Sequence, residues 1–398
     1  MPESTRVIVV GAGPVGFLTA LGLARQGIEV MVLEAEPGIS ESPRAAVYFP
    51  TTLKILDNLG LMADVEAIAY TSASFSYRML ATGEVIRVDT SKTFGEGAPF
   101  PYNAHFGQHI LAQIVLRHFV LLPNASVRWN TRVVGLRQNA SNVTLTVETP
   151  TGLEELTADW VVGADGARSG VRHCLGLPFE GHTWPERLVA TNVRYEFERF
   201  GFEPANMIAD AVNWAVVARL GREDLWRVTY AEPADLPESE ATDRIPAHYA
   251  ALLPDPHLPY EVVASSPYRI HERCAPTFRV GRVLLAGDAA HACNPCGGMG
   301  LTGGVIDSAA LVQVLSTVIG GRADESVLDF YSTERRRVFR EVTSPIASEY
   351  KRRMSEPDDA RRRSDFETFR VAAQAPEKSM MATTLAELVL GKPMPVSG

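Results

Sequence analysis

The chain of 398 residues is poor in cysteine, has no excess of positive charge and contains no long uninterrupted hydrophobic run. Its cysteines, only 4 in number, are too few for a disulfide framework and suit a reducing compartment, so we expect a cytoplasmic protein. Lys and Arg number 38 against 47 Asp and Glu, and the resulting net charge of −9 argues against a nucleic-acid partner and against stable membrane association. The N-terminal apolar run stops at Gly11 without a signal-peptide cleavage site, and no run reaches the roughly 18 apolar residues of a transmembrane helix.

What the sequence does have is a complete βαβ pattern at its start. A β-branched run at 6–10 predicts a buried strand, the apolar spacing of 17–24 predicts a helix, and 29–33 predicts a second strand that ends on Glu34. The first strand and the helix are joined by Gly11-Ala-Gly-Pro-Val-Gly16, in which the glycines permit a tight turn and a close approach of the backbone to a pyrophosphate. Glu34 can accept hydrogen bonds from an adenosine ribose. The unit predicts a dinucleotide site, without separating FAD from NAD.

Two further motifs follow at long separations. In the segment 159–172 an apolar strand runs through a Gly-Ala-Asp165-Gly turn into a helix, and Asp165 could alternatively be only a helix N-cap. In the segment 287–304 a strand ends on Gly-Asp288, and a glycine-rich loop leads to a helix that begins near Thr302. A carboxylate on this turn can hold sugar hydroxyls, and a helix N-terminus can stabilise the negative charge of a reduced flavin.

In this order and at these separations, the three motifs resemble those of the single-component FAD-dependent aromatic hydroxylases, the p-hydroxybenzoate hydroxylase type of group A flavoprotein monooxygenases. The match covers about 6–50, 105–180 and 279–318 and is weak elsewhere. The resemblance implies FAD as the cofactor and NAD(P)H and O2 as co-substrates. It also implies contacts with the ADP half of FAD at Gly11, Gly13, Pro14, Val15, Gly16, Glu34 and Ala35.

The rest of the cofactor site is implied in the same way. Arg44 resembles the arginine at the pyrophosphate, Gln108 the glutamine on the flavin chain, and Asp165 belongs to a motif that serves FAD and is implicated in NAD(P)H use. The resemblance further implies contacts with the ribityl chain and the flavin ring at Gly287, Asp288, Pro295, Gly298, Gly300, Leu301 and Thr302. A Pro-Pro pair is usual in this loop, whereas this chain has Asn294-Pro295. The catalytic candidates are Pro295, beside the ring, and Tyr48, which follows Arg44 at the domain junction.

These observations predict an α/β fold. We expect a Rossmann-like FAD-binding domain with a parallel sheet (1–72, 103–178 and 268–340), because the parallel-strand patterns lie there. Short alternating runs predict an inserted mixed or antiparallel β-sheet domain for the substrate (73–102 and 179–267), followed by a C-terminal helical segment (341–398). The arginine triplets at 335–337 and 361–363 are interpreted as solvated helix faces.

Several residues permit other interpretations. Cys293-x-x-Cys296 with His291 could be a redox or metal motif, but no second ligand pair accompanies it, so we expect a loop without metal. Large aromatic residues in the inserted sheet are expected to be mostly core, although some could line a pocket for a flat substrate. They are Trp184, Tyr195, Trp214, Trp226 and Tyr230.

The resemblance implies a monooxygenase that hydroxylates a small phenolic or heteroaromatic substrate through a flavin C4a-hydroperoxide. The alternatives are an oxygenase that tailors a polyketide or antibiotic or epoxidises an olefin, an O2-independent flavin reductase, and a flavin-bearing scaffold without turnover. The sequence leaves open the general base, the choice between NADH and NADPH, and the oligomeric state, with a homodimer among the options.

Overall fold

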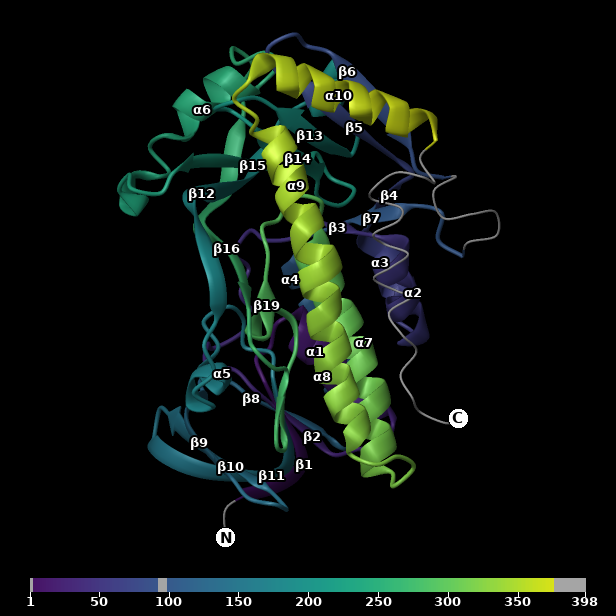
Figure 1. The fold of residues 1–398 in the computed structure, drawn as a ribbon, viewed down its shortest axis with the longest axis vertical. Helices are drawn as coiled ribbons and strands as arrows, with labels where there is room; N and C mark the ends of the chain where they lie inside the picture. Colours follow the sequence, from purple (N-terminus) through teal and green to yellow (C-terminus); the bar gives the residue numbers. More distant parts are fainter. Residues whose placement is uncertain (1–2, 92–98, 376–398) are drawn as a thin grey trace.

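The computed structural model describes residues 3–91 and 99–375, and it contains two large β-sheets, one toward each end of the molecule (Figure 1). The first, called here the parallel sheet, has parallel pairings along β18-β11-β1-β2-β8. In spatial order its strands are β17 (Arg279–Val280), β18 (Val283–Leu285), β11 (Gly152–Gly163), β1 (Glu3–Val10), β2 (Val30–Leu33) and β8 (Ala125–Arg128). β10 (Val143–Thr149) also pairs with β11, and β9 (Arg132–Gln138) pairs with β10.

The second sheet, called here the mixed sheet, is antiparallel except for the parallel pairing of β13 with β5. In spatial order its strands are β19 (His291–Ala292), β16 (Glu261–Cys274), β12 (Glu180–Arg194), β15 (Leu225–Pro233), β14 (Ala215–Arg219), β13 (Ala205–Ala209), β5 (Ser74–Met79) and β6 (Val85–Asp89). A small third sheet joins β3 (Val47–Tyr48), β7 (Asn103–His105) and β4 (Tyr70–Ser72).

The helices begin where the sequence supplies their start signals. α1 (Pro14–Arg25) has proline in its first turn, where a missing N–H costs no helical hydrogen bond. α1 packs between α4 and α7, so the glycine-rich turn that precedes it is held in the core. The remaining helices are α2 (Pro50–Asn58), α3 (Met62–Ile68), α4 (Gln108–Phe119), α5 (Gly170–Cys174), α6 (Ile245–Leu252), α7 (Met299–Ile319), α8 (Ser326–Val338), α9 (Ser344–Met354) and α10 (Asp359–Gln374).

α7 is long and apolar enough to cross a membrane by length and composition, although polar residues and glycines interrupt its apolar sequence. Most of it is buried against α1, α2 and α8, as is typical of a core helix. α8 and α9 are joined by one π-helical turn, Phe339–Thr343, and Figure 1 shows them running from the parallel sheet to the mixed sheet, where α10 crosses over β5 and β6.

The expected fold class is confirmed: a parallel sheet with a glycine-rich first turn, a mixed sheet built from inserted segments, and helices at the C-terminal side. In the mixed sheet, β5 and β6 come from one inserted segment and β12–β16 come from the other. The sheet also includes β19, which lies in the loop after β18. The domain boundaries themselves stay a prediction, and their portions at 1–2, 92–98 and 376–398 lie outside the described residues.

Candidate functional site

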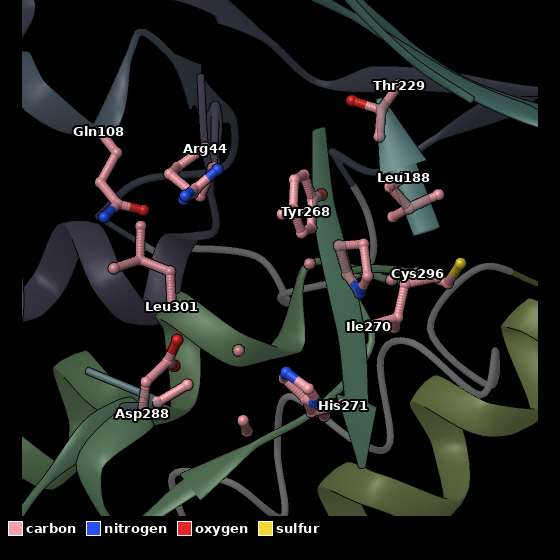
Figure 2. A pocket seen from close by; sticks show the side chains of 18 of the residues that line it. Arg44, Gln108, Leu188, Thr229, Tyr268, Ile270, His271, Asp288, Cys296 and Leu301 are labelled. Carbon is pink, nitrogen blue, oxygen red and sulfur yellow. The ribbon is translucent and has the colours of Figure 1, made fainter. Parts of the chain in front are cut away.

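A cavity of about 1340 Å³ is lined by loops at the carboxyl ends of β1, β11 and β18 and by strands of the mixed sheet. Its volume exceeds the roughly 300–1,000 Å³ of ordinary ligand pockets and leaves room for an elongated cofactor and a second, small molecule. Figure 2 shows Asp288, Leu301, Gln108 and Arg44 on one side of Tyr268, with Leu188 and Thr229 on the other.

The cavity wall brings most of the predicted site residues together. The predicted residues that line it are Gly13, Pro14, Val15, Arg44, Gln108, Asp165, Asp288, Pro295, Gly298, Gly300 and Leu301. Those that do not line it are Gly11, Gly16, Glu34, Ala35, Tyr48, Gly287 and Thr302. Except for Tyr48, the residues of this second group lie within or directly beside turns that carry lining residues, so they can support the cavity wall.

The glycine-rich turn has the shape that a pyrophosphate requires. Gly11 has a φ of +108°, and a Cβ at this position would lie 2.4 Å from the carbonyl oxygen of Ala164. A Cβ on Gly16 would lie 1.9 Å from the carbonyl oxygen of Gly11, so helix and strand meet too closely for any side chain. A Cβ on Gly13 would meet no protein atom within 4 Å, which leaves the backbone beside the N-terminus of α1 open to the cavity.

Glu34 connects the end of β2 to this turn. Its Oε2 accepts the backbone N–H of Ala12 at 2.8 Å, and its Oε1 accepts that of Glu36 at 3.0 Å. The carboxylate is half-buried beside the turn, with Ala35 next to it, and it keeps further acceptor positions that a ribose hydroxyl could use. The structure therefore gives Glu34 a structural hydrogen bond in addition to its predicted contact with the cofactor.

Asp165 lies on the turn between β11 and α5. The N-cap of α5 is Ser169, whose hydroxyl accepts the N–H of Arg172, so Asp165 does not occupy the N-cap position itself. Oδ2 of Asp165 accepts the N–H of Val171 at 3.1 Å, and burial raises the pKa of the carboxyl. Asp165 therefore stabilises the turn through this hydrogen bond, and it also lines the cavity.

The Gly-Asp turn after β18 is a single 3₁₀ turn, Gly287–Ala289, that holds Asp288 on the cavity wall. Asp288 is exposed and lines the cavity, and desolvation by the surrounding wall raises the pKa of its carboxyl. In the loop that follows, Pro295 lines the cavity, and α7 then begins with Gly300 and Leu301 on the wall. The hydroxyl of Thr302 donates to the carbonyl of Gly298 at 3.0 Å, which closes the first turn of α7.

Arg44 reaches across the cavity toward the mixed sheet. Its Nη1 donates to Oγ of Ser266 at 3.0 Å, and its guanidinium lies 4.9 Å from the centre of the Tyr268 ring. Within the described part of the chain Arg44 has no carboxylate partner, so its charge is available to a phosphate. Burial raises the pKa of Tyr268 to about 12, which keeps this phenol neutral at physiological pH.

The structure does not bring Tyr48 to the cavity. Its side chain is 1% exposed and stacks on Phe106 at 4.1 Å between ring centres. Burial strongly raises the pKa of its hydroxyl, which has no hydrogen-bond partner among the described residues. This placement does not support a direct contact between Tyr48 and a substrate, because adjacency to Arg44 in sequence does not fix the side to which a strand residue points.

Two groups of cavity residues were not identified from the sequence. The first consists of arginines without a carboxylate partner among residues 3–91 and 99–375: Arg168, Arg172, Arg227, Arg269 and Arg273. Arg227 is buried, and its Nε donates to Oδ1 of Asn192 at 2.8 Å. The second group is the mostly apolar wall from the mixed sheet: Phe75, Val88, Leu188, Met207, Val216, Thr229 and Ile270. Trp214, one of the aromatic residues that the sequence offered for a substrate pocket, lines the cavity beside them.

The Cys293–Cys296 pair lines the cavity with both thiols free. Burial raises the pKa of Cys296 to about 12 and also raises that of Cys293, so neither thiol is activated as a thiolate. No group of three or more His, Cys, Asp or Glu side chains suited to a metal ion occurs in the part of the chain that the structure describes. His291 instead packs below the loop, where its Nε2 lies 2.7 Å from Oδ2 of Asp307.

The residues present fit a flavin dinucleotide. An open backbone at Gly13, the Arg44 guanidinium and the acceptor oxygens of Asp288 line the same cavity, and these are the groups that a pyrophosphate and a polyhydroxyl chain require. The N-terminus of α7 lies at the same wall and offers N–H groups to a negatively charged ring edge.

Comparisons with known proteins agree with this geometry. The model of the FAD binding domain family matches residues 4–345. The para-nitrophenol 4-monooxygenase of Pseudomonas sp. (strain WBC-3) is 45% identical over 96% of this chain and 94% of its own length. The 6-hydroxy-3-succinoylpyridine 3-monooxygenase HspB of Pseudomonas putida (strain DSM 28022 / S16) is 44% identical over 88% of each chain. The crystal structure of p-nitrophenol 4-monooxygenase PnpA from Pseudomonas putida DLL-E4 superposes with a TM-score of 0.92 at 43% identity, over 98% of this chain and 99% of that one.

Proposed function

The chain belongs to the family of single-component FAD-dependent aromatic hydroxylases, and on that premise we propose that it hydroxylates a small phenol with an uncharged para substituent, such as p-nitrophenol. It is an FAD-dependent aromatic monooxygenase. When bound, FAD takes hydride equivalents from NAD(P)H and activates O2; the protein supplies position, a dry pocket and electrostatics. The proposal concerns the substrate and the residues that serve it.

The apolar wall of the mixed sheet carries this proposal. Leu188, Val216 and Ile270 present aliphatic surface to the cavity, and Trp214 adds an aromatic face, which suits a flat ring. Thr229 is a polar group on this stretch of wall, and it can hydrogen-bond a ring substituent. A substrate of this kind matches the compound named for the relative that is 45% identical.

Arg227 supports a phenolic rather than a plain aromatic substrate. It is a buried cation on the cavity wall, and burial lowers its pKa to about 10, so it stays charged at neutral pH. Because a cation stabilises a nearby anion, Arg227 favours loss of the phenolic proton, which raises electron density at the ring carbons ortho and para to the oxygen.

We propose the site residues as follows. Gly13, Pro14 and Val15 at the N-terminus of α1, with Arg44, hold the pyrophosphate; Glu34 holds the adenosine ribose. Asp288 and Gln108 hold the flavin chain, and Pro295, Gly300 and Leu301 lie beside the ring. Support comes from the continuity of these residues along one cavity wall, apart from Glu34, which lies beside the turn.

NAD(P)H is proposed to use the arginine-rich end of the cavity. Arg172 is buried, and its Nη atoms donate to the carbonyls of Ala289 at 2.9 Å and Ala167 at 2.8 Å. Arg273 donates to Thr183, and Arg168 and Arg269 complete a group that has no compensating salt bridge among the described residues. A diphosphate is the anion that such a group suits. A cytoplasmic location is proposed because all four cysteines are free thiols.

The test is a panel of phenols, hydroxybenzoates and hydroxypyridines, scored by NAD(P)H consumption and by product mass under ¹⁸O2. We expect 4-substituted phenols without a carboxylate to give labelled product in proportion to NAD(P)H consumed. Preference for a hydroxybenzoate would contradict the proposed uncharged para substituent, and turnover of a polyketide instead would support the tailoring alternative. Turnover without O2 would indicate a flavin reductase.

A further inference from the structure

Behind the Gly-Asp turn, and outside the cavity wall, lies a buried ionic network that the proposed function does not use. Asp307 is 0% exposed, and its partners His291 and Arg335 are 3% and 4% exposed. Oδ2 of Asp307 lies 2.7 Å from Nε2 of His291, and its Oδ1 accepts Nε of Arg335 at 2.7 Å. These contacts correct the interpretation of Arg335 as part of a solvated helix face.

The same carboxylate also holds the backbone of the turn. Oδ2 of Asp307 accepts the N–H of Gly287 at 3.0 Å, and Gly287 is the residue directly before Asp288. A second side chain of α8 assists, because the Tyr331 hydroxyl donates to the carbonyl of Leu285 at 2.9 Å. The peptide on each side of Ala286 is therefore fixed from α7 and α8 rather than by the strand alone.

Asp307 links three elements that meet at the flavin end of the cavity. It lies on α7, the helix whose first turn carries Gly300 and Leu301 on the wall, and it binds both the Gly-Asp turn and α8. His291 is further fixed by ring contacts with Phe278 and Phe339 at 5.6 and 4.6 Å. A displacement of this one carboxylate would move the turn relative to the N-terminus of α7.

Energetic considerations favour a role in orientation over a role in stability alone. A buried ion pair is no more stabilising on average than well-packed apolar side chains, because desolvation offsets its Coulombic attraction. What such a network provides is a fixed geometry, since its hydrogen bonds are directional and costly to break. The fixed geometry here is that of the turn carrying Asp288.

We propose that Asp307, held by Arg335 and His291, is a positioning residue that sets the Gly287–Asp288 turn in the orientation that binds FAD. The inference rests on the proposed contact of Asp288 with the cofactor, and it does not depend on the identity of the aromatic substrate. It predicts that changes in the network weaken FAD binding without touching any residue of the cavity wall.

The experiment measures FAD retained by purified holoenzyme on dilution and filtration, without NAD(P)H or aromatic substrate. Asp307→Asn and Arg335→Met should each raise the Kd for FAD by about tenfold or more, because each removes a charged hydrogen-bond partner. Arg335→Lys, which keeps the cation, should restore part of the affinity. The visible absorption bands of the remaining bound flavin should shift in Asp307→Asn, since a misplaced turn changes the surroundings of the ring.

Glu232→Gln is the matched control. Glu232 is a buried carboxylate paired with Arg187 at 2.6 Å and Arg244 at 2.8 Å, in the mixed sheet and off the cavity wall. Its loss should lower the melting temperature and leave the Kd for FAD unchanged. If Asp307→Asn behaves as this control does, the network only supports the fold and the proposal is wrong. If Asp307→Asn does not fold, Arg335→Met and His291→Gln decide in the same way. Unchanged FAD binding in Asp288→Ala would instead overturn the proposed contact itself.

Discussion

Among single residues, Asp288 is expected to have the most direct effect on FAD binding. Asp288→Ala removes the carboxylate from the wall at the Gly-Asp turn, and we expect FAD affinity to fall by about 1.5–3 kcal/mol, the usual loss for a charge-assisted hydrogen bond. Equilibrium filtration of the holoenzyme measures it. Asp288→Asn keeps the shape and one acceptor and should lose less. Unchanged binding in the alanine variant would place the ribityl contact elsewhere.

Glu34 tests the adenosine end separately. Glu34→Lys loses the acceptor for the Ala12 N–H and places a cation where the ribose is expected, so FAD binding should weaken by a similar amount. Glu34→Gln retains an acceptor oxygen for the Ala12 N–H and should have a smaller effect. Equal FAD retention in the lysine variant and the unmodified enzyme would exclude Glu34 from the cofactor site.

Single residues also show where sequence-based prediction stops. Asp288 and Gly13 follow from local motifs, because a strand, a turn and a helix start define their surroundings within a few residues. Arg335 lies in a charged triplet whose spacing resembles a solvated face, and its partner Asp307 is 28 residues away in sequence. Arg227 was likewise missed, since alternation along a strand shows that a residue points inward but not that it borders a cavity.

At the scale of elements, the first βαβ unit contains two glycines whose substitution by alanine should have different effects, one on folding and the other on FAD binding. Gly11→Ala would place a Cβ 2.4 Å from the Ala164 carbonyl in a backbone conformation that alanine disfavours, so we expect loss of folded protein. Gly13→Ala meets no protein atom within 4 Å, so we expect normal folding and weaker FAD binding. Melting curves with and without added FAD separate the two results. Normal FAD affinity in Gly13→Ala would show that the cofactor does not approach this backbone.

The C-terminal helices give a prediction about how the stability of the protein changes at acidic pH. Hydrogen bonds from Arg352 hold the pKa of Glu349 at about 2, below its usual value of 4.5, so the stabilising charge is fully present above about pH 4.5 and is lost as the pH falls toward 2. Because the side chain is 34% exposed, we expect less than about 1 kcal/mol. The difference in melting temperature between Glu349→Gln and the unmodified enzyme should shrink over that range. A difference in melting temperature that stays constant with pH would mean that Glu349 stabilises the protein through packing and not through its charge.

Individual helices and strands were predicted from the sequence more reliably than the pairing between strands. The strand at 6–10, the helix at 17–24 and the long helix near 302–318 correspond to β1, α1 and α7, because a β-branched run marks the strand and apolar stretches preceded by glycine-rich turns mark the helices. The parallel pairing of β13 with β5 inside an otherwise antiparallel sheet could not be predicted, since strand order depends on contacts between segments about 130 residues apart. The π-helical turn between α8 and α9 has no local signature either.

At the scale of the whole molecule, the cavity explains why the substrate wall was not predicted. Its cofactor side comes from turns with recognisable motifs, whereas its substrate side is assembled from the inward faces of strands in the mixed sheet. On such strands, core and cavity residues have the same alternating pattern, so Trp214 on the wall and Trp226 in the core look alike in sequence. The chemistry was therefore predictable from the sequence, and the specificity was not.

A cavity shared by two sheets also predicts how the molecule unfolds. Because the proposed FAD contacts include Pro295, in the loop after β19 of the mixed sheet, as well as turns of the parallel sheet, cofactor present at about one hundred times its Kd should stabilise both sheets together by about 2.7 kcal/mol. Trp160 reports on the parallel sheet and Trp226 on the mixed sheet, and both are buried. The chain has 5 tryptophans, so each variant keeps only Trp160 or only Trp226 and has the others changed to phenylalanine. The denaturant curves of both single-tryptophan variants should coincide with release of FAD. If the mixed sheet unfolded first while FAD stayed bound, cofactor binding would be confined to the parallel sheet, and the shared cavity would serve only the substrate.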